Sequence, residues 1–137
     1  MKYKYTLTED KIYIDVVSKE INFKGYSDKV ELLVDIREGN VIVKAGYAWD
    51  GCSVKLFRIG KLYIGTPDGF HNETKWASCI HDVLYQFHKE INKDQELITR
   101  LEVDNLFRDE LIKAEWRMTN LYYKVVRSRL GQEFWDR

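Results

Sequence analysis

The spacing of apolar residues changes near the middle of the chain and divides the sequence into two kinds of structure. In the first part, the segments KIYIDVV, VELLVDI and NVIVKAGYAW are rich in β-branched and aromatic residues and partly alternate apolar with polar positions, which is typical of strands. The turn-forming letters REGN, which include Gly39 and Asn40, join the last two segments. Residues 1–48 are therefore predicted to form antiparallel β-hairpins or a sheet.

A glycine-containing stretch separates these strands from a helical second half. Residues 49–72 contain several glycines and the only proline, Pro67, and this composition indicates an irregular loop region. Residues 73–130 are predicted to form three helices, because apolar residues recur at spacings of three and four in segments 73–89, 94–115 and 116–130. Residues 131–137 are predicted to be a tail. Strands followed by helices favour one α+β domain that spans residues 1–137.

The composition narrows the class of protein without pointing to a function. The chain has 137 residues, enough for one hydrophobic core, and 22 Lys and Arg residues balance 22 Asp and Glu residues. No net charge therefore attracts nucleic acid over a long range, and we expect no nucleic-acid partner. The first residues lack the apolar core of a signal peptide, and no later run reaches the roughly 18 apolar residues of a membrane span. We expect a soluble chain without a signal peptide or a transmembrane segment.

Two of the predicted helices carry polar residues that suggest chemistry. On the first helix, His81 and Tyr85 lie one turn apart on one face, whereas Asp82 lies about 100° around the helix from His81. On the second helix, Asp104 occupies a position where the pattern calls for an apolar side chain. The predicted inward stripe there consists of Leu97, Leu101, Asp104, Phe107 or Arg108, and Leu111. Burying a carboxylate without hydrogen bonds costs several kcal/mol, roughly, so we expect His81 or Tyr85 to donate to Asp104.

This arrangement has two interpretations that the spacing leaves open. An aspartate that fixes one nitrogen of an imidazole leaves the other nitrogen to take a proton from water, as a general base does near neutral pH. In the second interpretation, His81, Tyr85 and Asp104 only connect two helices through hydrogen bonds. Both interpretations place the three side chains within hydrogen-bonding distance of one another.

The same residues resemble the active helices of the phospholipase A2 superfamily. His81, Asp82 and Tyr85 match that family's His-Asp-x-x-Tyr motif, and RLEVDNLFRDEL, which contains Asp104, resembles its second helix. The segments WDGCS and TPDGF are similar to the loop that precedes the first helix in the bacterial branch. The resemblance covers about residues 49–114 and implies an antiparallel helix pair of the phospholipase A2 type.

The resemblance also implies a mechanism, that of a calcium-dependent ester hydrolase acting on phospholipid. His81 would be the general base that activates water, Asp104 would orient His81, and Tyr85 would hydrogen-bond to Asp104. Asp50 and Asp82 would bind Ca²⁺, whose oxygen ligands are typically carboxylates and carbonyls. The cation would polarise the ester carbonyl and stabilise the oxyanion.

A longer part of the chain resembles short phage and bacterial proteins of unassigned function, which join a loop of the form G-aromatic-x-W-D-G-small-S to a His-Asp helix. The segments GYAWDGCS, SCIHDVLY, EVDNLF and LYYKVVRSRLG lie where that family has them. This resemblance implies a phage or prophage origin, and a location in the host cytoplasm or the virion. It leaves two alternatives to the hydrolase. One is a non-catalytic virion or host-interaction protein that binds a phage or host protein, and the other is a metal-stabilised binding module that needs Asp50 and Asp82 but not His81.

Overall fold

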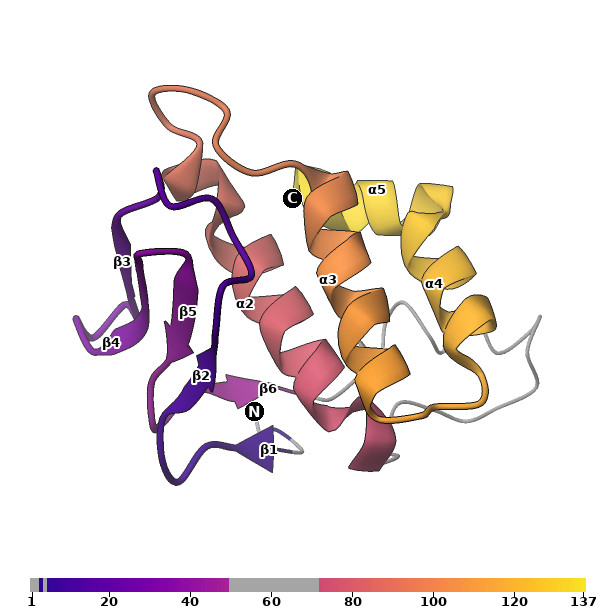
Figure 1. The fold of residues 1–137 in the computed structure, drawn as a ribbon. Coiled ribbons are helices and arrows are strands. Elements are labelled where there is room, and N and C mark those ends of the chain that lie inside the picture. The colour runs from indigo at the N-terminus through magenta and orange to yellow at the C-terminus, as the bar shows by residue number, and fades with distance from the viewer. Residues whose placement is uncertain (1–2, 4, 50–71) are drawn as a thin grey trace. The chain divides into compact units, whose positions relative to one another are not determined.

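The computed structural model describes residue 3 and residues 5–49 and 72–137 (Figure 1). The chain divides into two compact units. The first, which we call the strand unit, consists of residues up to 49 together with residues 86–99, and the second, the helical unit, contains residues 72–85 and 100–137 among those described. The protein is of the α+β class, as the sequence predicts. That residues 1–137 form one domain stays a prediction.

The strand unit contains two antiparallel sheets. Strands β1 (Tyr5–Thr6) and β6 (Ala48–Trp49) form a two-stranded sheet. A four-stranded sheet has the order β2-β5-β4-β3 and consists of β2 (Lys11–Tyr13), β5 (Asn40–Val43), β4 (Leu32–Arg37) and β3 (Phe23–Tyr26). The predicted hairpin is confirmed: Arg37 pairs with Asn40 across a two-residue turn in which Glu38 and Gly39 both have positive φ, 54° and 83°. Positive φ at both central residues is the geometry that suits a tight hairpin.

One face of the four-stranded sheet is apolar and buried. Its buried side chains are Tyr13, Val34, Ile36, Val41 and Val43. Phe87 packs on this face, with its ring centroid 5.8 Å from that of Phe23. A Cβ at Gly25 would lie 2.7 Å from the Phe87 ring and 2.8 Å from Val34, so the strand needs a residue without a side chain at this position. The close approach of Phe87 to the backbone of β3 therefore explains the glycine.

Four α-helices and one 3₁₀ helix lie within residues 72–137. They are η1 (Asn72–Thr74), α2 (Lys75–Ile91), α3 (Arg100–Lys113), α4 (Thr119–Arg127) and α5 (Arg129–Asp136). Helix α2 confirms the first predicted helix. The second predicted helix was expected to begin at residue 94, but residues 94–99 are not helical. The side chain of Asn92 holds them in a loop: Oδ1 accepts hydrogen bonds from the amides of Leu97 and Ile98, and Nδ2 donates to the Ile98 carbonyl.

The third predicted helix and the predicted tail are wrong. The segment 116–130 is not one helix, because Ser128 adopts an extended backbone conformation, with ψ 175°, between α4 and α5. Its hydroxyl donates a 2.6 Å hydrogen bond to the Val125 carbonyl, which also accepts the Ser128 amide at 3.2 Å. The predicted tail forms most of α5. The helical half therefore has four α-helices where the sequence predicts three.

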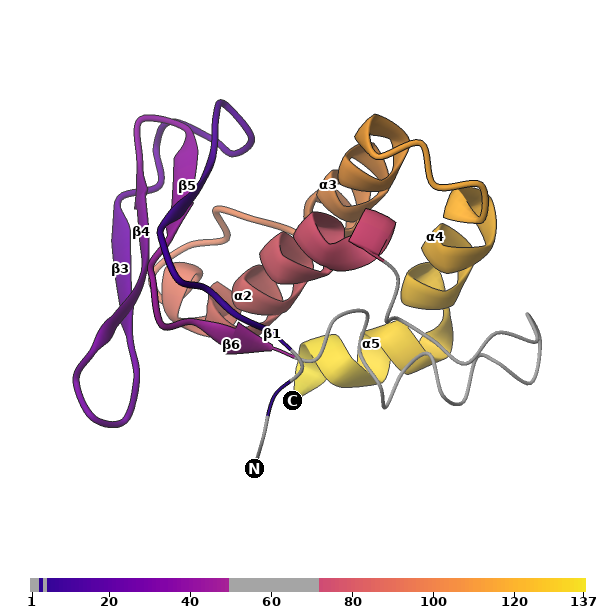
Figure 2. The same cartoon turned by 90° about the horizontal axis from the view of Figure 1, so that it is seen from below.

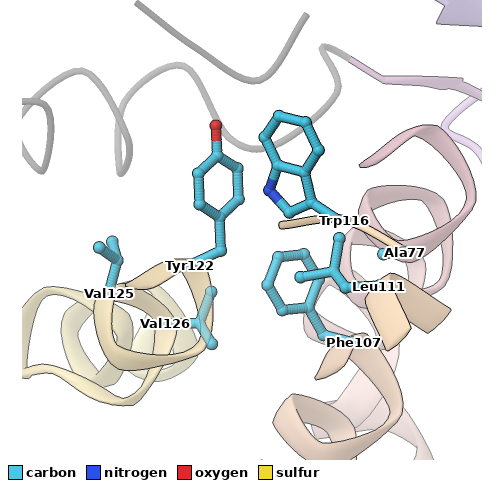
Figure 3. Packing of buried hydrophobic residues seen from close by; sticks show 7 residues of the cluster. All are labelled: Ala77, Phe107, Leu111, Trp116, Tyr122, Val125 and Val126. Carbon is cyan, nitrogen blue, oxygen red and sulfur yellow. The ribbon is translucent and has the colours of Figure 1, made fainter. Parts of the chain in front are cut away.

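The helices of the helical unit share an apolar cluster. Figure 3 shows its buried residues, which are Ala77, Phe107, Leu111, Trp116, Tyr122, Val125 and Val126. Helix α3 runs beside α2 in the opposite direction, and α4 packs against α3 (Figures 1 and 2). Each large side chain buried in this way contributes roughly 1.5–3 kcal/mol relative to an exposed one. This packing fixes the distances between α2, α3 and α4. The contacts between the polar side chains of these helices depend on those distances.

Candidate functional site

Asp104 lies at the centre of a polar cluster in the helical unit. Its side chain is 0% exposed, and both of its oxygens are hydrogen-bonded. Oδ1 is 2.9 Å from His81 Nε2 and 2.6 Å from the Tyr85 hydroxyl, while Oδ2 accepts a 2.8 Å hydrogen bond from Arg127 Nη1. The structure thus brings together the three residues for which the sequence predicts contact. It also adds Arg127, whose contact with Asp104 the sequence did not predict.

The burial of the cluster and its hydrogen bonds act in opposite directions on the Asp104 carboxyl. Burial alone raises the pKa of this group, but the hydrogen bonds from His81, Tyr85 and Arg127 together hold the pKa below its ordinary value of 3.8. For Tyr85, burial and the negative charge of Asp104 act in the same direction. They raise the pKa of the phenol well above its ordinary value. At neutral pH Asp104 is therefore an ionised acceptor, and Tyr85 is a neutral donor.

The ionised state of Asp104 determines how the imidazole of His81 is protonated. Because the carboxylate can only accept, Nε2 carries the hydrogen in the 2.9 Å contact. In the neutral imidazole the lone pair is then on Nδ1, and no described residue hydrogen-bonds to that nitrogen. Two aromatic neighbours hold the imidazole ring. Its centroid lies 4.1 Å from that of the Tyr85 ring and 4.9 Å from that of the Phe107 ring. His81 is thus oriented and nearly buried, and within the described part of the chain its Nδ1 accepts no hydrogen bond.

Arg100 connects the start of α3 to the junction between α4 and α5. Its Nη2 donates to the carbonyls of Val126 and Ser128, and its Nη1 donates to Gln132 Oε1, at 2.8–2.9 Å. Its Nε lies 3.6 Å from Asp104 Oδ2, which makes an ion pair but not a hydrogen bond. The guanidinium of Arg100 therefore contacts both the α4–α5 junction and the carboxylate of Asp104. The i,i+4 spacing of Arg100 and Asp104 was the signal in the sequence that could have identified this pair.

Helix α5 closes another side of the cluster. The ring of Trp135 meets the ring of Tyr85 edge to face, with centroids 5.0 Å apart and an angle of 78°. The predicted tail thus contributes an aromatic contact to the residue that donates to Asp104. An edge-to-face contact of this kind typically contributes about 0.5–1.5 kcal/mol beyond the area that it buries.

The predicted calcium ligands are only partly placed. Asp82 lies on α2 and is partly buried, whereas Asp50 lies outside the described residues. No group of three or more His, Cys, Asp and Glu side chains within residues 5–49 and 72–137 is arranged to hold a metal ion. That Asp50 and Asp82 converge on Ca²⁺ therefore stays a prediction.

No helix in the described ranges combines the length and the apolar character that a membrane crossing needs.

A protein family described as "Protein of unknown function (DUF1353)" matches residues 29–125 of this chain. The matched range contains His81, Tyr85, Arg100 and Asp104, and it ends two residues before Arg127. None of the curated proteins matches the chain, and none of the solved structures does. The match agrees with the predicted relationship to a family of unassigned function. The comparisons give no support to a relationship with the phospholipase A2 superfamily.

Proposed function

The chain belongs to the DUF1353 family of proteins of unknown function, and we propose that it is an ester hydrolase in which His81 is the general base. The observation that carries this proposal is the 2.9 Å contact between His81 Nε2 and Asp104 Oδ1. It orients the imidazole and directs its basic nitrogen away from the carboxylate. A general base needs both properties.

The proposed reaction is the attack of water on an ester carbonyl. His81 Nδ1 takes a proton from the water, and the oxygen of the water forms a bond to the carbonyl carbon. The tetrahedral intermediate then loses the alcohol oxygen, which takes the proton back from Nδ1 and leaves as the free alcohol, so that the acid and the alcohol are the products. While His81 is protonated, the negative charge of Asp104 stabilises the imidazolium. Tyr85 donates to the same oxygen and fixes the carboxylate in this position.

Calcium and a phospholipid substrate belong to this proposal because of the motif formed by His81, Asp82 and Tyr85. The Asp82 carboxylate follows His81 directly on α2, and a carboxylate is a hard oxygen donor that suits Ca²⁺ better than a soft metal. Asp82 and Asp50 would hold the cation. Bound calcium would supply positive charge at the oxyanion of the intermediate.

A specific observation favours a second candidate, in which the cluster has no catalytic role. Asp104 accepts hydrogen bonds from α2 and α4, and Arg100 contacts it from one turn earlier on α3. A buried carboxylate that connects three helices would be retained for stability and for specifying one packing arrangement. A phage virion or host-interaction protein that binds another protein would need no more than this.

The substitution His81→Gln separates the two candidates, because a glutamine amide can still donate to Asp104. For the hydrolase, release of fatty acid from mixed phospholipid vesicles in the presence of calcium should fall by roughly 100-fold or more. The thermal unfolding midpoint should change little. For the structural cluster, neither the wild type nor His81→Gln should release fatty acid.

A matched control is His88→Gln, since His88 is the other buried histidine of α2 and lies seven residues further along. It removes an imidazole from the same helix without touching Asp104, so hydrolysis should be retained. If the wild-type protein releases no fatty acid from any vesicle in calcium or in chelator, the phospholipase assignment fails. Equal activity of wild type and His81→Gln would remove the role of His81 as the base.

A further inference from the structure

Arg127 uses little of its hydrogen-bonding capacity. A guanidinium has five N–H donors in a planar fork, and among the described residues Arg127 makes one hydrogen bond, from Nη1 to Asp104 Oδ2. Its side chain is 32% exposed. The remaining donors of this positively charged group have no hydrogen-bond partner among the described residues, and the side chain is partly exposed.

Arg100 differs from Arg127 in each of these respects. The Arg100 side chain is 12% exposed, and its two terminal nitrogens bind the Val126 and Ser128 carbonyls and Gln132. These contacts account for Arg100 as a structural residue that holds the α4–α5 junction. They leave no such explanation for the Arg127 donors that bind no described residue.

The charges of the cluster do not balance. Two guanidinium groups, Arg100 and Arg127, contact the single carboxylate of Asp104, and the Tyr85 phenol is neutral. The contacts of the cluster therefore leave one positive charge in excess. Because partly buried charge interacts strongly with an opposite charge nearby, this excess favours an anionic ligand at the exposed guanidinium.

The position of Arg127 relative to His81 is fixed by Asp104. Arg127 binds Oδ2, and His81 contacts Oδ1 of the same carboxylate. The two side chains therefore bind the two oxygens of one carboxylate. A substrate with its ester at His81 Nδ1 and its phosphate at Arg127 would extend across this carboxylate.

We propose that Arg127 binds the phosphate group of the substrate and so selects anionic phosphate esters. The proposal rests on the assignment of His81 as the base, since it places the phosphate beside the ester that His81 would hydrolyse. A guanidinium suits this task because its planar fork can donate two parallel hydrogen bonds to two phosphate oxygens. The phosphate could belong to a lipid headgroup or to a soluble phosphate compound, and both would be recognised through the same oxygens.

Binding can be measured without turnover by NMR, using the arginine Nε–Hε signals of the ¹⁵N-labelled full chain. Three probes distinguish the sources: inorganic phosphate, a short-chain diether phosphatidylcholine below its micelle concentration, and the matching diether glycerol without phosphate. Ether bonds prevent hydrolysis. We expect the phosphate-bearing probes to shift the Arg127 signal and the uncharged probe to leave it unchanged. A larger affinity for the diether lipid than for inorganic phosphate would indicate a lipid headgroup.

Variants then assign the effect to Arg127. Because the variants lack the Arg127 signal, binding is followed there by the backbone amide signals that phosphate shifts in the wild type. Arg127→Gln should weaken phosphate binding by roughly tenfold or more, because charge-assisted hydrogen bonds are lost. Arg127→Lys keeps the charge without the fork, so it should weaken binding by a smaller factor. The matched control is Arg129→Gln, which removes the same charge two residues away, from a side chain that is 92% exposed and pairs with Glu133 at 3.7 Å. It should bind phosphate as the wild type does.

Several results would overturn the proposal. They are a wild-type Arg127 signal that does not move at roughly 50 mM phosphate, an equal loss of binding in Arg127→Gln and Arg129→Gln, or equal shifts with the uncharged diether. If Arg127→Gln does not fold, the wild-type signal and Arg127→Lys still decide. The proposed hydrolysis is tested separately. If phosphate binding depends on Arg127 but no ester is hydrolysed, the phosphate site at Arg127 is retained and the proposed enzymatic activity is rejected.

Discussion

Tyr85 donates a 2.6 Å hydrogen bond to Oδ1 of Asp104, the same oxygen that His81 contacts. The phenol and the imidazole therefore share one acceptor, and the ring of one lies 4.1 Å from the ring of the other. Because the pKa of the Tyr85 phenol is raised by burial and by the charge of Asp104, Tyr85 stays a donor throughout the neutral range. In the proposed reaction, Tyr85 would hold the carboxylate and His81 would transfer the proton.

Tyr85→Phe removes this hydrogen bond and keeps the ring. We expect the free energy of unfolding to fall by about 1.5–3 kcal/mol, the range for a hydrogen bond to a charged group. The matched control is Tyr123→Phe, because Tyr123 donates a bond of the same 2.6 Å length to Asn105, which is neutral. That loss should be smaller, about 0.5–1.5 kcal/mol. Urea unfolding at pH 7 measures both, and equal losses would contradict the view that Asp104 is ionised.

Asp104→Asn should change how stability depends on pH. The folded-state pKa of Asp104 lies below its ordinary value of 3.8, so the unfolded chain binds this proton more readily than the folded chain. The contribution of Asp104 to stability is therefore fully present above its ordinary pKa and is lost as the pH falls through the lowered, folded-state value. At pH 7 we expect Asp104→Asn to cost about 3–5 kcal/mol, since it leaves two partly buried guanidinium groups without their carboxylate.

The difference between wild type and Asp104→Asn should then shrink as the pH is lowered from about 5 towards 2. Urea unfolding at several pH values measures it. Asp10→Asn is the control, because Lys44 and the Ala45 amide also lower the pKa of Asp10, but at the surface of the strand unit. Its effect at pH 7 should be much smaller. A difference for Asp104→Asn that is constant with pH would show that Asp104 does not titrate as we infer.

The sequence predicted the residues of the cluster where local geometry determines them. His81 and Tyr85 share a face because they are four residues apart on one helix, and Asp104 was recognisable as a polar residue in an apolar stripe. The predicted inward position of Leu101 in the same stripe was wrong, because Leu101 is 49% exposed. The inward position one turn before Asp104 belongs to Arg100, whose guanidinium binds carbonyls at the end of α4. A pattern that treats arginine as a surface residue could not have predicted this.

The predicted helix ends were wrong where a single side chain or a close contact overrides the apolar spacing. Leu97 and Ile98 continue the spacing of α3 backwards, yet the side chain of Asn92 binds their amides and keeps them in a loop. Leu130 continues the spacing of α4 forwards, yet the chain breaks at Ser128. Both features depend on contacts formed only in the folded chain. The pairing of Arg127 with Asp104 could not be predicted from spacing, because the two residues lie 23 positions apart on different helices.

Gly131 should be the most sensitive position of the α4–α5 junction. It lies in the first turn of α5, and a Cβ there would be 1.8 Å from the Val126 carbonyl oxygen and 2.9 Å from Arg100 Nη2. A backbone carbonyl at a helix end cannot move aside without breaking the hydrogen bond that it accepts from Arg100. Gly131→Ala should therefore lower the free energy of unfolding by about 3 kcal/mol, the upper part of the range for overpacking.

Gly46→Ala is the control. At Gly46 φ is +97°, but no atom lies within 4 Å of the added Cβ. Conformational strain alone should therefore cost roughly 1–2 kcal/mol there. Urea unfolding of both variants measures the difference, and a Gly131→Ala protein as stable as the wild type would show that α5 does not lie this close to the end of α4.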